Sequence, residues 1–427
     1  MHFNARKYPQ IGPQMIRHQV YFDTLGSMKE DSASWRSTFA GLSVLRLVDT
    51  YADAGTATSP DGWAQLHSVQ AAVETINPGN PIRSALTAVF EETSRRSAVD
   101  ETVCQTLLAY GRALDYEGSW GLATDVFSTV AKLIRPEKNA RLAVEAHVAV
   151  GGAARRNGDW DTSARAYSQA AYIADTLGDR SGVLTVQVGI ANTYLAKGNL
   201  PQAETILDDV IVQAREQEFP EIQGVALHSR AAIAQRRGEH AECVKLGYEA
   251  LNLCTKPASR DAVLADIAAG LSELGMIESA RDAHLILANT SQLEWVRWQA
   301  TINLMELAGR DGAEDAFETY ASQLSEAKLS PTHKAYFLLF RGEGLAGFGK
   351  HAEAEETLRA AVSFASDNQL HQIVFEADSA LSRLQVSAKE ARREKASRVP
   401  ATWSEDLSQV VAGLTHLREV AFATSAK

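Results

Sequence analysis

The chain has 427 residues, of which 45% are hydrophobic and 22% are charged. This length exceeds what one hydrophobic core supports, so the chain is either two or three globular domains or one elongated repeat array. The formal net charge of −11 argues against nucleic acid as the main partner, because binding to phosphates requires a large surplus of Lys and Arg. No apolar run approaches the roughly 20 residues of a membrane span.

The three cysteines are too few for a disulfide framework, and no Cys/His spacing matches a zinc site. Cys243 and Cys254 could bridge in principle, but free thiols in a reducing compartment are the main interpretation. We therefore expect no metal and no cofactor. The first residues lack the apolar core of a signal peptide, so the cytoplasm is the expected location.

The first hundred residues carry no clear repeat. Residues 1–33 show little periodicity and contain Pro9, Gly12, Pro13 and Gly26, which predicts an irregular arm. From Ser34 the helical period returns, and two further helices are predicted over 63–76 and 81–96. Residues 34–100 are interpreted as divergent helices that form a cap or a degenerate repeat.

A repeated turn follows. Its clearest anchors are Gly118, Gly158, Gly198 and Gly238, spaced by 40 residues, each with a small residue five positions later. The series continues at Gly275 and Gly349, with a weaker copy centred on Asp311, so residues 101–368 hold about seven copies. A small residue or a weak substitute precedes each anchor by seven positions. These residues are Gly111, Gly151, Ala191, Ala231, Ala268, Leu304 and Gly342.

The pattern has a physical explanation. Each copy is two helices, and neither buries its apolar face alone, so neighbours must stack. The small residues lie where two helices cross most closely, and the anchor glycine ends the first helix in a left-handed conformation. Asp159 and Asn199 are predicted to cap the second helices. Phe127, Tyr167 and Leu207 are expected to fill the space within each pair.

The small residues, the Gly-Asp-Trp turn and the following Ala resemble the tetratricopeptide repeat. The 40-residue spacing, clearest over Leu177–Glu204, is similar to the longer subtype found in kinesin light chains and in the sensor regions of MalT-type and Rap-type bacterial regulators. The resemblance implies an all-α, right-handed superhelical solenoid of antiparallel helix pairs with capping helices at both ends. It departs from the family pattern at Ser163, Cys243 and Gly247.

Residues 369–427 are predicted to form C-terminal helices that cap the solenoid. Pro400 interrupts them, and residues 402–405 read as the capping box of a final helix. One apolar stripe runs along this helix and must be covered by the last repeat, by a second subunit in a homo-oligomer, or by a partner. The stripe consists of Trp403, Leu407, Val410, Leu414, Leu417 and Val420.

No sequence motif for catalysis is convincing. Residues 344–351 match a phosphate-binding loop except at His351, which replaces the required Ser or Thr. Gly349 is already assigned to a turn, and Ala335–Arg341 reads as a helix where a phosphate-binding loop needs a strand. His228 and His284 are isolated on helices. We therefore predict a protein that is not an enzyme and has no catalytic residues.

Two functions remain open: a protein-interaction scaffold or adaptor, and a regulatory sensor that responds to a peptide or small ligand. In both, the first helices of the pairs would line a concave groove that binds a protein or peptide, with acidic groups opposite the arginines. The alternative for the arginines is that they only complement helix dipoles. The groove candidates are Arg112, Arg155, Arg156, Asn192, His228, Gln235 and Arg236, with Asp115, Trp298, Met305, Tyr336 and Glu343 as further members of the same face.

Overall fold

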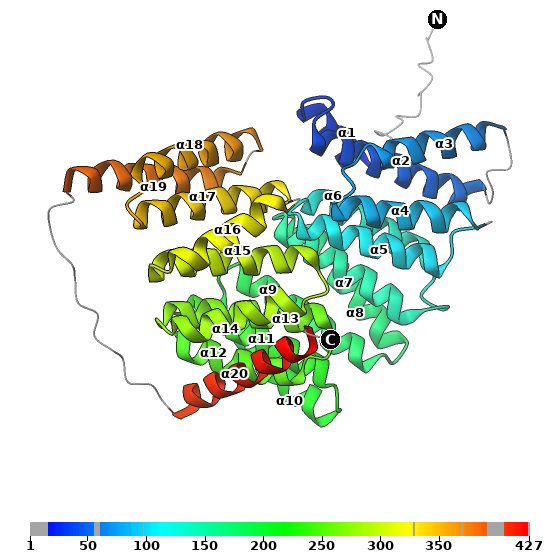
Figure 1. Cartoon of the computed structure of the whole chain (residues 1–427). Coiled ribbons are helices and arrows are strands. Elements are labelled where there is room, and N and C mark those ends of the chain that lie inside the picture. The colour runs from blue at the N-terminus through cyan, green and yellow to red at the C-terminus, as the bar shows by residue number, and fades with distance from the viewer. Residues whose placement is uncertain are drawn as a thin grey trace, which may run out of the picture. The chain divides into compact units, whose positions relative to one another are not determined.

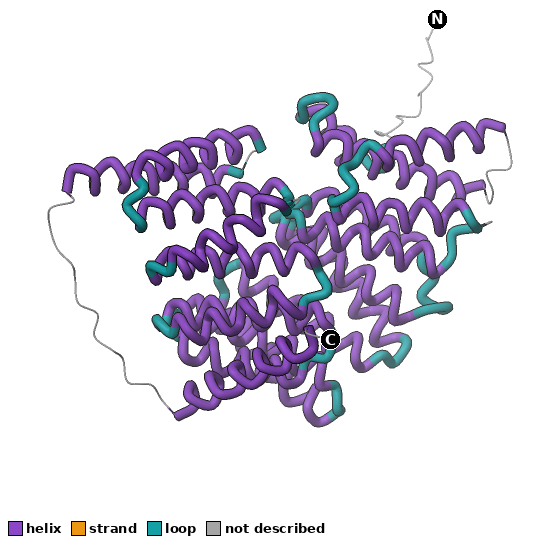
Figure 2. Tube along the Cα trace, viewed as in Figure 1, coloured by secondary structure: helices purple, strands orange, loops and turns teal. Residues whose placement is uncertain are grey.

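The computed structural model describes residues 16–54, 60–96, 98–327, 329–368, 370–390 and 405–425. Every regular element within these ranges is an α-helix (Figure 2). By the distribution of its internal contacts the chain divides into two compact units, Met1–Gly182 and Val183–Lys427. The predicted all-α class of paired helices is confirmed.

In the first unit, consecutive helices pair through short turns, and α5–α6 and α7–α8 pack along their length (Figure 1). Buried leucines and valines from α2, α4, α5 and α6 join in one apolar core. The helices of this unit are α1 (Gln19–Ser27), α2 (Ala33–Ala54), α3 (Pro60–Glu74), α4 (Pro81–Ser94), α5 (Glu101–Tyr116), α6 (Trp120–Leu133), α7 (Ala140–Arg156) and α8 (Trp160–Thr176).

The predicted irregular arm over residues 1–33 is wrong where α1 forms. Tyr21 explains this helix, because its side chain is fully buried and its hydroxyl lies 3.0 Å from the hydroxyl of Tyr110 on α5. Such long-range contacts stabilise a nine-residue helix that would be marginal on its own. The local sequence pattern carries no trace of them.

His18 precedes α1 and holds it to two other helices. Its Nδ1 lies 2.5 Å from Asp125 Oδ2 on α6, and its Nε2 lies 3.2 Å from Asp49 Oδ2 on α2. The imidazole side chain is only 4% exposed. Burial alone would lower the pKa of His18, but the hydrogen bonds to Asp125 and Asp49 outweigh it and raise the pKa to about 9.

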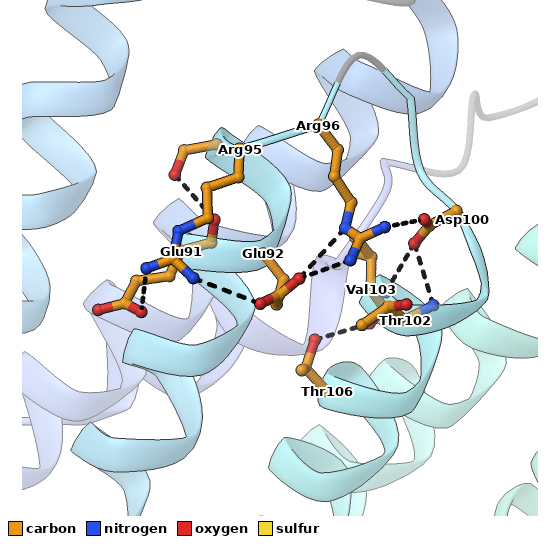
Figure 3. Close-up of polar contacts among 9 residues, drawn as sticks. Glu91, Glu92, Arg95, Arg96, Asp100, Thr102, Val103 and Thr106 are labelled. Atoms are coloured by element: carbon orange, nitrogen blue, oxygen red, sulfur yellow. Dashed lines mark hydrogen bonds and ion pairs between the residues drawn. The ribbon is translucent and has the colours of Figure 1, made fainter.

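The junction between α4 and α5 is fixed by one arginine (Figure 3). Arg96 donates to Glu92 through Nε at 3.1 Å and Nη2 at 2.9 Å, and it forms an ion pair with Asp100. Asp100 Oδ1 in turn accepts from the backbone amides of Thr102 and Val103, at 3.0 and 3.2 Å, and so caps α5. The first clear repeat therefore begins at a cap that is tied to the preceding helix.

The second unit is also built of stacked helix pairs, up to α18, and α19 packs on α18 and α17. Its helices are α9 (Arg180–Ala196), which begins at the boundary, α10 (Leu200–Glu216), α11 (Pro220–Arg236), α12 (His240–Leu253), α13 (Pro257–Glu273), α14 (Ile277–Thr290), α15 (Glu294–Asp311), α16 (Glu314–Glu326), α17 (Pro331–Gly347), α18 (His351–Asp367), α19 (His371–Glu390) and α20 (Glu405–Ser425).

The turn inside each predicted pair has the same backbone in every copy. A glycine adopts φ between 72° and 81°, and the next residue donates its amide to the carbonyl five residues earlier, at 2.9 Å. This is a Schellman C-cap, which needs a left-handed residue and therefore favours glycine. The glycines are Gly118, Gly158, Gly198, Gly238, Gly275, Gly312 and Gly349.

The sixth turn corrects the predicted register. Its left-handed residue is Gly312 (φ 74°), whereas the sequence pattern centred this copy on Asp311. The crossing position therefore moves by one, from Leu304 to Met305. The position that is small in most other copies holds Phe317, whose side chain is completely buried.

Two crossings confirm the role of the small residues. A Cβ added at Gly342 would lie 2.6 Å from Cγ of Leu358, and one added at Gly111 would collide with the ring of Phe127. Both Phe127 and Leu358 are buried. No side chain fits at these two glycine positions without moving the partner helix.

Packing also accounts for the glycines of the phosphate-loop-like motif. Gly344 leaves room for the ring of Phe317, which a Cβ at this position would overlap. Gly349 forms the seventh turn with φ 81°. Both lie on or directly after α17, a helix, so the strand that a phosphate loop requires is absent from this part of the chain.

Both predicted N-caps are confirmed. Asp159 accepts a hydrogen bond from the amide of Thr162 at 3.0 Å, and Asn199 accepts one from the amide of Gln202 at 3.3 Å. Each follows a turn glycine directly, so one short turn closes the first helix and starts the second.

A second left-handed turn recurs 40 residues apart, at Gly178 (φ 67°) and Glu218 (φ 57°). A side chain in this conformation is strained by about 1–2 kcal/mol, and Glu218 is exposed. We expect Glu218→Gly to raise the free energy of unfolding by about 0.5–1 kcal/mol, after the added entropy of the unfolded chain is subtracted. Urea denaturation checks this, with Gln213→Gly inside α10 as the destabilising control.

The last helix, α20, lies on α14 and α12 (Figure 1). The predicted placement on the last repeat is therefore wrong. Leu407, Val410 and Leu414 are buried there, as the apolar stripe predicts, whereas Val420 is 47% exposed. Trp403 lies outside the described residues.

Candidate partner-binding surface

The first helices of the first unit carry three of the predicted arginines. Arg112 on α5 forms an ion pair with Glu145 on α7, and the two side chains are 56% and 46% exposed. The pair links neighbouring first helices while leaving both charged groups accessible to solvent. The structure thus brings Arg112 of one repeat together with a carboxylate of the next repeat.

A second ion pair links the same helices in the opposite direction. Arg156 on α7 donates Nε to Oδ1 of Asp115 at 2.8 Å and Nη2 to Oδ2 at 2.5 Å. This two-point geometry is the strongest that a guanidinium and a carboxylate can adopt. The two side chains are 35% and 23% exposed, so the pair is more shielded than that of Arg112.

Arg155 lies differently from its neighbour. It is partly buried, its Nε has no hydrogen-bond partner, and burial lowers its pKa. Electrostatic interactions with Tyr167 and Asp115 act in the opposite direction. Arg155 and Arg156 both lie in the last turn of α7, where cations complement the helix dipole.

The other four candidates belong to the second unit, and three of them make contacts within the chain. His228 Nε2 lies 2.7 Å from Asp266 Oδ2, which links α11 to α13. Arg236 donates Nη1 to the carbonyl of Leu195 at 2.7 Å and so closes the last turn of α9.

The two amide candidates differ in their surroundings. Gln235 Oε1 lies 3.0 Å from His240 Nδ1, and Asn192 is partly buried on α9. The seven candidates are therefore divided between the two units, three in the first and four in the second.

Two further groove candidates are core residues. Met305 is fully buried and Trp298 is 9% exposed, with its ring 5.9 Å from that of His333. For Met305 the corrected register of the sixth copy explains the error. Because the turn lies at Gly312 and not at Asp311, the groove position moves from Met305 to Glu306. Burial, and to a smaller extent Glu343, raises the pKa of Glu306.

The remaining two candidates lie on α17. Tyr336 is partly buried and stacks on Phe340 with ring centroids 5.8 Å apart. Glu343 accepts a hydrogen bond from Arg383 of α19 at 2.7 Å. Glu343 and Arg383 are 40 residues apart, and Asp115 and Arg156 are 41 apart. A search of the sequence for opposite charges about one repeat apart would therefore have identified Arg383 as the partner of Glu343.

Within the described residues, no group of three or more His, Cys, Asp or Glu side chains is arranged to hold a metal ion. None of the described helices is both long and apolar enough for a bilayer span. Cys104, Cys243 and Cys254 are buried free thiols. Burial raises the pKa of Cys104 to about 12 and that of each of the other two to about 11, which makes all three poor nucleophiles.

No family model matches the sequence, and no curated protein matches it. Among solved structures, the apo quorum sensor NprR from B. thuringiensis is 13% identical with a TM-score of 0.41, over 81% of this chain and 92% of that chain. NprR in complex with its cognate peptide NprX is 11% identical with a TM-score of 0.42, over 82% and 92%.

A Rap protein in complex with Competence and Sporulation Factor is 14% identical with a TM-score of 0.33, over 83% of this chain and all of that chain (100%). Likeness at this level carries no conclusion about what this chain binds. The paired helices and their shared turns establish the repeat architecture independently of these structures.

Proposed function

We propose that this chain is a non-enzymatic interaction scaffold that binds a peptide or protein partner on the exposed face of its first helices. One observation carries the proposal. Neighbouring first helices α5 and α7 present two arginines and two carboxylates side by side, all four of them partly open to solvent. An array of this kind can exchange its internal ion pairs for pairs with a partner.

The energetics favour such exchange. Exposed ion pairs contribute only about 0–1 kcal/mol each, so replacing Glu145 by a carboxylate of the partner costs little. Arg112 can then bind that carboxylate through two hydrogen bonds, as guanidinium groups prefer. The displaced Glu145 becomes available for a cation of the partner. The partner is therefore a peptide or protein with acidic groups opposite Arg112 and Arg156.

The net charge and the cysteines support two further parts of the proposal, namely that the partner is not a nucleic acid and that the protein is cytoplasmic. The net charge of −11 disfavours nucleic acid as a partner. The three free thiols suit a reducing compartment, so we assign the protein to the cytoplasm.

Peptides selected on the wild-type chain from a random 12-residue display library test the proposal. We expect them to be rich in Asp and Glu and to bind more weakly as ionic strength rises, because exposed charges are screened. The decisive variant is the charge exchange Arg112→Glu with Glu145→Arg. It keeps the ion pair between α5 and α7 but moves the positive charge, so affinity for the selected peptides should fall by about tenfold or more.

Exchange of an ion pair in the second unit, Arg359→Glu with Glu355→Arg on α18, is the matched control and should leave affinity unchanged. These two residues also form an exposed ion pair, four residues apart on one helix. Selected peptides without acidic residues, or acidic peptides that bind both variants equally, would contradict the proposal.

The regulatory sensor stays a prediction. It requires that a bound peptide change a second part of the chain. Hydrogen exchange with and without a selected peptide distinguishes the two functions: a scaffold gains protection only on its first helices, whereas a sensor also changes protection elsewhere.

A further inference from the structure

The last helix rests on a surface formed by helices far from it in the sequence. Five helices, α15 to α19, separate α14 from α20 along the chain, yet α20 packs on α14 and α12, the second helices of their pairs. Leu407, Val410 and Leu414 join the same apolar cluster as Leu251 and Leu287. We call this face of α12 and α14 the α12–α14 surface.

Two features make the contact specific. The ring of Tyr248 on α12 crosses α20 at Gly413, where an added Cβ would lie 2.7 Å from the Tyr248 Cζ. At the far end, Arg418 donates Nη1 to Asp282 Oδ1 on α14 at 2.7 Å. A helix that binds this surface therefore needs a glycine where it crosses Tyr248, and a cation five residues later to pair with Asp282.

Asp282 is the polar group that needs a partner. Its side chain is 12% exposed, and Arg418 is its only ion-pair partner among the described residues. A carboxylate that a covering helix shields from water is costly without a cation, so any helix that covers this surface must carry Arg or Lys beside Asp282. This requirement comes from α12 and α14, whichever chain supplies the helix.

The attachment of α20 is limited. Only three of its described side chains are buried, with Val411 and Leu417 partly buried, and Ser408, Gln409 and Ala412 face solvent. Helices with few buried apolar contacts open locally at a lower free energy than the core. The α12–α14 surface can therefore be vacated without unfolding the helix pairs.

We propose that the α12–α14 surface is a binding site for an amphipathic helix of a partner protein, and that α20 occupies it as an intramolecular competitor. The partner helix carries apolar residues at positions i, i+3, i+7 and i+10, glycine at i+6 and Arg or Lys at i+11. This is the spacing of the α20 residues that contact the surface. The site lies on second helices and is independent of the arginine pairs on α5 and α7.

The experiment uses the full-length chain with α20 released, and a labelled synthetic peptide of residues 405–425 as the probe. Val410→Asp with Leu414→Asp removes two buried contacts and releases α20. Ala412→Asp adds a charge on the exposed side of the same helix and is the matched control. If α20 covers the site in more than about 90% of molecules, release should strengthen peptide binding at least about tenfold, since apparent affinity scales with the open fraction.

The peptide's own variants test the two specific contacts. Peptides with Arg418→Glu or Gly413→Leu should each lose binding to the released chain by about tenfold or more, because one leaves Asp282 unpaired and the other collides with Tyr248. Gly413→Leu in the full chain is a second way to release α20. Far-UV circular dichroism and the melting temperature confirm that each released chain stays folded.

Three results would overturn the proposal. The released chains could fail to bind the peptide, or they could bind all peptide variants equally. Alternatively, sedimentation could show that the wild-type chain is a dimer that the release variants lose, which would identify the occupant as α20 of a second copy. Tight binding to the released chain that depends on Arg418 and Gly413, with a monomeric wild-type chain, supports it.

Discussion

Replacing Gly151 by leucine should destabilise the protein by about 3 kcal/mol, the upper end for overpacking a close helix crossing. A Cβ at this position would lie 2.8 Å from Cζ and 2.9 Å from both Cε atoms of the Tyr167 ring. Tyr167 is 4% exposed, so its ring is enclosed by the protein. The helix pair α7–α8 must therefore separate or the ring must leave its rotamer.

The adjacent glycine supplies the matched control. A Cβ at Gly152 would meet nothing closer than Arg156 Nη2 at 3.5 Å, an ordinary contact with a flexible side chain. Gly152→Ala should therefore stabilise the helix by about 0.5–1 kcal/mol, whereas Gly151→Ala should destabilise it. Both substitutions replace glycine by alanine in the same helix, so they change helix propensity equally. A difference between the two variants in urea denaturation therefore reports on which face of the helix the residue lies. If Gly151→Ala and Gly152→Ala unfold alike, the crossing is not as close as the structure has it.

The turns and crossings were predictable because each depends on residues a few positions apart. A glycine with φ near 75° and a cap such as Asp159 leave a mark in the local sequence, repeated at 40 residues. The register of the sixth copy was predicted wrongly because its packing depends on residues that are not close in sequence. Phe317 replaces a small residue there, and the compensating Gly344 lies in the next helix pair, which a pattern within one repeat does not reveal.

The helices at the two ends were less predictable, because distant residues decide their place. The apolar stripe of α20 shows that one face is buried, but Tyr248 and Asp282 decide where it packs. For α1 the deciding contacts are those of Tyr21 and His18 with helices as much as 107 residues away. Neither end carries a periodic mark of these contacts.

The helices that carry the candidate arginines were predictable from the sequence, but the pairing of these arginines was not. Arg112 and Arg156 lie on the expected first helices, yet each contacts a carboxylate about one repeat away. Arg236 has the same sequence position in its copy as Arg156, but it contacts a backbone carbonyl because its neighbouring copy has Leu195 where the first has Asp115. The contact that each arginine makes therefore depends on the residue that the preceding repeat places beside it.

The stability of the first unit should fall as the pH rises from about 6.5 to about 9. His18 has a pKa of about 9 in the folded chain and an ordinary pKa near 6.5 when unfolded. Because the folded value is the higher one, the stabilisation from charged His18 is complete below pH 6.5 and is lost as the pH passes 9. The difference corresponds to about 3 kcal/mol at most.

Other groups near His18 titrate outside this window. Hydrogen bonds from His18 outweigh burial and lower the pKa of Asp49, and burial raises the pKa of Tyr110 above that of free tyrosine, so they act at acid and strongly alkaline pH. Burial lowers the pKa of His284 and His333 to about 4. Their contribution therefore makes the protein more stable as the pH rises, and most of this rise lies below pH 6.5. The loss between pH 6.5 and 8.5 is therefore assigned to His18.

His18→Asn is the variant that tests this assignment. Residue 18 has φ 59°, a left-handed value that asparagine tolerates better than other side chains. The variant keeps the backbone but removes the titrating group between Asp49 and Asp125. Urea denaturation at pH 6.5, 7.5 and 8.5 should show the wild-type chain losing about 2–3 kcal/mol over this range, while His18→Asn starts less stable and changes little. Parallel pH profiles for the two chains would show that His18 is not charged when it anchors α1 to α2 and α6.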